Sequence, residues 1–68
     1  MLENAHKILD IEIDELLFIT DDEVDHRYKE KLKKAQDEKT KNDIESAFRE
    51  LHEETKRERY YEKITKHP

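Results

Sequence analysis

The chain has 68 residues, of which 49% are charged and 32% apolar, and its formal net charge is -5. This length permits one domain with a thin core, and the lack of cysteine excludes disulfides, thiolate metal sites and a cysteine nucleophile. No apolar run is long enough for a membrane span, and the N-terminal segment lacks the apolar stretch of a secretory signal, so we expect a soluble, cytoplasmic protein.

The first nineteen residues predict short helical pieces. Five apolar residues fit one helical face: Leu2, Ala5, Leu9, Ile13 and Leu16. The sequence IEIDELLFI, residues 11–19, also alternates like a strand, but an isolated strand has nothing to pair with in this chain. We therefore predict a short helix over residues 2–9 and a second apolar turn around residues 14–18.

A second helix is predicted over about residues 20–36. Thr20 and Glu23 have the spacing of a capping box at its start. Four residues recur at intervals of four, four and three and form its apolar stripe: Val24, Tyr28, Leu32 and Ala35. Acid-to-base pairs at i, i+4 join Asp25 with Lys29 and Glu30 with Lys34.

A third helix is predicted over about residues 42–53, with Asn42 as its N-cap. Its apolar stripe contains Ile44, Ala47, Phe48 and Leu51. A polar connection of about six residues separates it from the second helix, and connections this short fold neighbouring helices into an antiparallel hairpin.

The residues after 52 either continue the third helix or break near residues 53–55 before a last helical turn or two, to which Tyr60 contributes. Residues 66–68 are expected to be a tail. The predicted fold class is therefore all-α: an antiparallel helical hairpin with short flanking N- and C-terminal helices, in a single domain over residues 1–65.

The charge is unevenly distributed along the chain. Residues 1–25 carry nine acids and one base, residues 26–41 carry seven bases and three acids, and residues 42–68 carry six bases and seven acids. Two interpretations are open: the acidic and basic segments attract one another within the fold, or the basic segment docks on a partner. Nucleic acid is disfavoured as the main partner, because phosphate binding needs a net basic surface.

Several short sequences keep a fixed order and spacing along the chain. They are ILDI at 8–11, TDDEV at 20–24, Tyr28, IESAFREL at 44–51 and KRERY at 56–60. Over roughly residues 5–61 this arrangement resembles a J-domain, the helical module of DnaJ-type co-chaperones. Six residues fall at positions of the family's third helix, with Phe48 in place of the family's Tyr: Ala47, Phe48, Leu51, Lys56, Arg57 and Tyr60.

The chain departs from the J-domain pattern where the family has its activity. The resemblance implies that a His-Pro-Asp tripeptide, which triggers ATP hydrolysis by a DnaK-type chaperone, should fall at Gln36, Asp37 and Glu38, and none of the three matches. Asp10 replaces a Gly at the end of the first helix, and about four extra residues lie within EIDELLF before Thr20. These departures imply a retained fold and a lost activity.

Two segments are candidate partner-binding surfaces. The family presents bases on its second helix to an acidic chaperone surface, and the corresponding residues here are Arg27, Lys29, Lys31, Lys33 and Lys34. Asp25 and Glu30 stand where the family commonly has bases, which weakens the implied docking on a DnaK-type chaperone. The second segment is the apolar cluster around Leu17 and Phe18, because so small a core cannot hide it completely.

The remaining apolar positions predict the core. Its expected members are Leu9, Val24, Tyr28, Leu32, Ala35, Ile44, Ala47, Phe48, Leu51 and Tyr60. Arg57 and Tyr60 are expected to clamp the last helix against the hairpin. The four histidines share no i, i+4 spacing with each other, so we expect no metal, no cofactor and no catalytic residue.

Two hypotheses for function follow. The first is a non-catalytic, J-like protein interaction module that does not stimulate a DnaK-type chaperone ATPase, and whose partner is that chaperone, a true J-protein or an unrelated target. The alternative is a small helical regulator, of the phage or mobile-element type, that shares only its fold with J-domains. The apolar cluster also leaves a homodimer open.

Overall fold

The computed structural model describes residues 4–66, and within this range every regular element is helical. In chain order the elements are α1 (Ala5–Ile8), the short 3-10 helix η1 (Ile13–Glu15), α2 (Asp21–Lys34), α3 (Glu38–Leu51) and α4 (Glu54–Thr65). Leu2 and the end of the predicted tail, His67 and Pro68, lie outside the described residues. The all-α class is confirmed for the described part of the chain.

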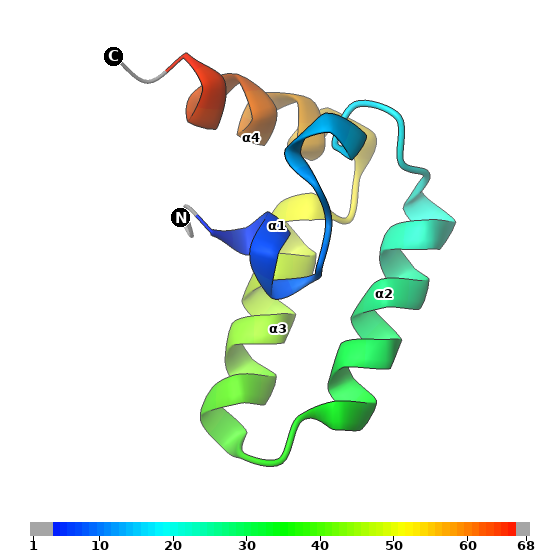
Figure 1. Ribbon diagram of the computed structural model, residues 1–68, viewed down its shortest axis with the longest axis vertical. Helices are drawn as coiled ribbons and strands as arrows, with labels where there is room; N and C mark the ends of the chain where they lie inside the picture. Colours follow the sequence, from blue (N-terminus) through cyan, green and yellow to red (C-terminus); the bar gives the residue numbers. More distant parts are fainter. Residues whose placement is uncertain (1–3, 67–68) are drawn as a thin grey trace.

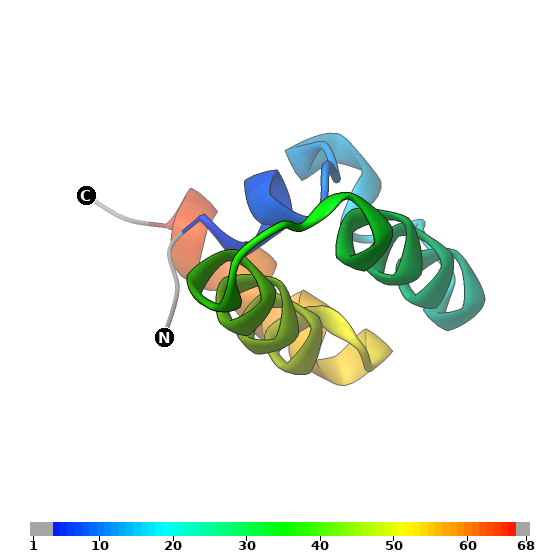
Figure 2. The same cartoon turned by 90° about the horizontal axis from the view of Figure 1, so that it is seen from below.

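Helix α3 lies at the centre of the fold and contacts α1, α2 and α4. Helices α2 and α3 run antiparallel, and α4 leaves the end of α3 in a different direction (Figure 1). Seen along the hairpin, α1 and η1 lie together on one side of α2 and α3 (Figure 2). The described molecule measures 35 × 25 × 16 Å, so its core is a single layer between these helices.

The N-terminal segment changes direction at Asp10, whose φ is 62°. Leu9 and Ile11 on either side of it are both buried. Two residues separated by one position point roughly 200° apart on a continuous helix, so a break is needed to bury both. Asp tolerates this left-handed conformation better than most residues. The break separates α1 from η1, where two short pieces were predicted.

The prediction that Asn42 caps the third helix is wrong. The Asp37 carboxylate accepts a hydrogen bond from the Thr40 backbone N–H at 2.7 Å, and α3 begins at Glu38. The connection after α2 is therefore residues 35–37, about half the length predicted. Asp is as good an N-cap as Asn, and no Gly or Pro follows it, so the helix starts at the first available cap.

The other helix ends are closer to the predicted ones. Thr20 accepts a hydrogen bond from the Glu23 backbone N–H at 3.1 Å and caps α2, which ends at Lys34 rather than at residue 36. Helix α3 ends at Leu51 and α4 begins at Glu54. Of the two alternatives for the C-terminal segment, the break near residues 53–55 is the one observed.

Among residues 4–66, nine apolar residues form the buried core: Ala5, Leu9, Ile11, Leu16, Val24, Ile44, Ala47, Leu51 and Tyr60. Six of these are among the ten predicted core residues. The other four predicted residues are partly buried and pack against the core: Tyr28, Leu32, Ala35 and Phe48. The rings of Tyr28 and Phe48 stack with their centroids 4.0 Å apart and join α2 to α3.

Candidate docking surface

Three large apolar side chains are exposed on one segment of the structure. The exposed fraction is 40% for Ile13, 45% for Leu17 and 83% for Phe18. Leu16 in the same segment is buried, and Ile19 is partly buried against the core. These two side chains anchor the segment, which we call the apolar loop (residues 13–19), while the Phe18 ring stays in solvent.

The apolar loop borders a shallow depression of about 460 Å³. Residues of the loop, of the start of α2 and of the start of α4 line it: Leu17, Phe18, Ile19, Thr20, Asp21, Asp22, Glu54 and Arg57. The Arg57 side chain is only 2% exposed and pairs with Asp21 at 2.7 Å. Within residues 4–66, Asp22 and Glu54 form no ion pair. The accessible charge of the depression is therefore negative.

Arg57 fixes the position of the apolar loop relative to α4. Its guanidinium donates hydrogen bonds to the backbone carbonyl oxygens of Leu51 at 2.9 Å, His52 at 3.1 Å and Ile19 at 3.0 Å. The first two carbonyls belong to the end of α3, where helical partners run out, and the third ends the apolar loop. One buried side chain thus joins the loop, α3 and α4, in agreement with the structural role predicted for it.

Arg27, a predicted partner-binding residue, is engaged within the fold. Its guanidinium forms a two-pronged contact with the Glu15 carboxylate at 3.0 and 2.8 Å, and also binds Glu23 and the Asp10 carbonyl. These hydrogen bonds lower the pKa of the Glu15 carboxyl and raise the pKa of Arg27. The acidic first third of the chain therefore neutralises part of the basic second helix.

The four lysines of α2 differ in their pairing. Lys29 pairs with Asp25 at 2.9 Å, as predicted, whereas Glu30 pairs with Lys33 at 3.8 Å instead of with Lys34. Lys31 and Lys34 form no ion pair within residues 4–66. They border a second depression that also contains carboxylates from the N-terminal segment and from α2 itself. The basic helix thus presents a surface of mixed charge.

The position that the J-domain resemblance assigns to the tripeptide lies at the tip of the hairpin. Gln36 and Asp37 are in the connection, and Glu38 is the first residue of α3. Hydrogen bonds from the side chain and the backbone N–H of Thr40 lower the pKa of the Asp37 carboxyl. Asp37 therefore serves to start a helix.

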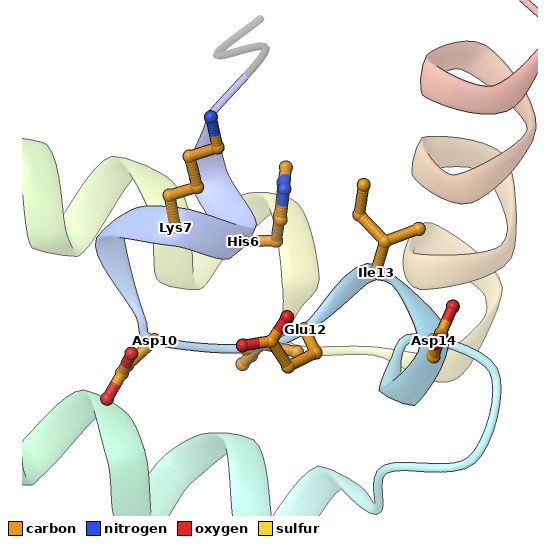
Figure 3. Close-up of a pocket in the computed structure, with 7 residues that line it drawn as sticks. His6, Lys7, Asp10, Glu12, Ile13 and Asp14 are labelled. Carbon is orange, nitrogen blue, oxygen red and sulfur yellow. The ribbon is translucent and has the colours of Figure 1, made fainter.

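A third depression, of about 350 Å³, lies beside α1 and η1. Its polar side chains do not converge, and Lys7 and Asp10 point away from one another (Figure 3). His6 is 6% exposed, and its Nδ1 lies 2.8 Å from the Tyr60 hydroxyl. In the described part of the chain no group of three or more His, Asp or Glu side chains is placed to hold a metal ion. No periodicity of apolar residues predicts this buried contact between His6 and Tyr60.

Stability is expected to fall as the pH drops below about 6.5. Burial lowers the pKa of His6 from its ordinary value of 6.5, and nearby Lys7 lowers it further, while Glu12 opposes the shift. The unfolded chain therefore binds a proton at a higher pH than the folded one, so acidification favours unfolding. Urea unfolding at a series of pH values measures this loss.

A His6→Gln variant is expected to show a smaller loss of stability over the same pH range, because its side chain does not titrate. The exposed His26→Gln variant serves as the matched control and should keep the wild-type pH dependence. Equal pH dependence in His6→Gln and the wild type would contradict the assignment to His6.

The sequence matches no protein-family model, and no curated protein or solved structure matches it. None of the helices formed by residues 4–66 combines the length and the apolar character needed to cross a membrane.

Proposed function

We propose that this protein is a non-catalytic, J-like protein interaction module that docks on a protein partner through Leu17 and Phe18. The observation that supports this proposal is the Phe18 ring, which is 83% exposed. It lies on the apolar loop, and Leu16 and Ile19 of the same loop are anchored in the core. Aromatic side chains held in place lose little conformational freedom on binding and often dominate the binding energy.

Three features of the structure support the J-like part of the proposal. Asp10 stands where J-domains have a Gly, and its φ of 62° is a conformation that Gly adopts freely. Arg57 and Tyr60, which match positions of the family's pattern, are both buried, although they lie on α4 and not on α3. The element order also places the connection between two antiparallel helices at Gln36 and Asp37. Because the tripeptide is absent there, we propose binding without stimulation of ATP hydrolysis.

One observation favours the alternative, a small helical regulator of an unrelated target. The exposed residues Ile13, Leu17 and Phe18 all lie within EIDELLF, the segment that departs from the J-domain pattern. A docking surface built from the departing segment has no counterpart in the family's own binding surface. The basic helix, with Lys29, Lys31, Lys33 and Lys34, is the family-like surface, so docking through this helix as well as through Phe18 is what distinguishes the J-like hypothesis from the alternative.

Site-specific crosslinking tests the role of Phe18. Benzoylphenylalanine in place of Phe18 is expected to yield a discrete crosslinked product, and the same group in place of exposed Lys41 is not. Unlabelled wild-type protein should compete the product away, whereas Phe18→Ser should not compete. Phe18→Ser should keep its stability within about 0.5 kcal/mol, because the side chain is on the surface. Competition by Phe18→Ser equal to that of the wild type would rule out this surface.

A single-turnover ATPase assay with a DnaK-type chaperone tests the class of partner. We expect no stimulation, since the tripeptide is missing. If this chain reduces the ATPase stimulation produced by a true J-domain, the J-like hypothesis is supported. If the Lys31→Ala/Lys34→Ala variant no longer reduces that stimulation, the inhibition is assigned to α2. Absence of inhibition favours the unrelated target, and severalfold stimulation by the chain alone would contradict a lost activity.

A further inference from the structure

We infer that the partner segment docking on the apolar loop is basic and amphipathic, and that it places a Lys or Arg side chain in the depression between Phe18, Asp22 and Glu54. This inference rests on the proposed function and specifies the chemistry of the partner. It follows from the charges and the apolar groups that the structure brings together at the starts of α2 and α4.

The depression selects for positive charge. The base among its described lining residues, Arg57, is 2% exposed, and its two terminal nitrogens are engaged by Asp21 and by backbone carbonyls. Its Nε has no hydrogen-bond partner but is buried, so the guanidinium presents little accessible surface to an anion. Asp22 and Glu54 come from different helices, are exposed, and form no ion pair in the described part of the chain. An acidic partner surface would be repelled here, whereas a Lys or Arg head group would gain two carboxylates.

The apolar side of the same depression fits the hydrocarbon stem of the partner's Lys or Arg side chain. The Phe18 ring is 83% exposed and lies beside Leu17 and Ile19. The hydrocarbon stem of a Lys or Arg can pack on the ring while its head reaches a carboxylate, and the cation is attracted to the ring face. An apolar residue next to it in the partner would cover Leu17. Both requirements together describe an amphipathic basic segment.

A second copy of the chain is a poorer occupant. The bases without an ion pair in its own second helix, Lys31 and Lys34, lie on a different surface from the apolar loop. Docking of one copy's basic helix on another copy's loop closes into a dimer only where a two-fold axis lets both such contacts form at once. Sedimentation of the wild-type protein as a monomer up to millimolar concentration supports this reasoning, and self-association lost in Phe18→Ala would overturn it.

Titration of isotopically labelled protein with two synthetic peptides tests the inference. One is an amphipathic helical peptide of Leu, Lys and Ala, and the other carries Glu in place of every Lys. Binding of the Lys peptide should shift the backbone amide signals of residues 17–22 and 54–57, and the Glu peptide should leave them unchanged. Phe18→Ala should weaken the binding of the Lys peptide by about tenfold, because a central aromatic contact is lost.

Charge variants separate the depression from general attraction between an acidic protein and a basic peptide. Asp22→Asn/Glu54→Gln should weaken binding of the Lys peptide by roughly fivefold, since two rim carboxylates are lost. Asp43→Asn/Glu45→Gln on α3 changes the net charge equally and should have little effect. Equal weakening by both double variants would overturn the inference.

The peptide experiment can fail separately from the proposed function. Phe18-dependent binding of the Glu peptide would overturn the basic partner class while leaving docking through Phe18 standing. Binding of neither peptide would also overturn it, and the crosslinking competition described above would still decide whether Phe18 docks on a partner.

Discussion

Replacing Arg57 with alanine is expected to destabilise the protein by about 3 kcal/mol or more, enough to unfold a substantial part of so small a domain. The variant leaves the carbonyl oxygens of Leu51, His52 and Ile19 without their donor and opens a cavity where the side chain is 2% exposed. Urea unfolding followed by far-UV circular dichroism measures the loss.

Three variants provide controls for Arg57→Ala. Arg57→Lys keeps the charge but loses the planar guanidinium that reaches several carbonyls at once. Its free energy of unfolding should therefore lie between that of the wild type and that of Arg57→Ala. Arg59→Ala removes an exposed base from the same helix and should change stability by less than about 0.5 kcal/mol. Asp21→Asn removes the carboxylate that pairs with the buried guanidinium, so it should cost more than Arg59→Ala but less than Arg57→Ala. A free energy of unfolding for Arg57→Ala equal to that of Arg59→Ala would contradict the structural role of Arg57.

Replacing Tyr60 with alanine is expected to cost about 3 to 5 kcal/mol, the loss typical of a buried aromatic side chain. Tyr60 is 1% exposed and belongs to the core that α4 shares with the N-terminal segment. Tyr60→Phe keeps the ring and removes the hydroxyl that contacts His6, so it should cost about 1 kcal/mol. Thermal unfolding of the two variants separates packing from hydrogen bonding.

Tyr61 offers a matched comparison for Tyr60, since it is the adjacent aromatic residue and only partly buried. Tyr61→Ala should cost clearly less than Tyr60→Ala. The reverse order would show that α4 packs through a different face. The stability of Tyr60→Phe should still fall on acidification, as described for His6, because burial is the largest cause of the lowered pKa of His6.

Apolar periodicity predicted the two helices of the hairpin, because an amphipathic stripe reports the face that packs. It left the C-terminal segment open, and α4 with its 12 residues is longer than the turn or two of the alternative with a break. Periodicity placed Val24 and Ile44 on facing sides of α2 and α3, and both are buried. It did not predict the start of α3, because Asp37 and Asn42 are similar caps and no local signal ranks them. The buried Ile11 was also missed, since burying it depends on the turn at Asp10.

The candidate docking surface was only partly predictable. The exposure of Leu17 and Phe18 followed from the limited capacity of a small core. The acidic depression could not be predicted, because Asp22 and Glu54 line the same depression only when the start of α4 lies beside the start of α2. Likewise, the sequence showed that Arg27 is basic, but its neutralisation by Glu15 depends on how the N-terminal segment packs.

The contact between Arg57 and the Ile19 carbonyl sets an order of events during synthesis. The apolar loop is made before the side chain that fixes it to α4, because Arg57 follows Ile19 by 38 residues. A nascent chain that has not reached Arg57 therefore carries the apolar residues of the docking surface without the geometry. The candidate docking surface therefore takes its final geometry only after Arg57 has been made and has bound the Ile19 carbonyl.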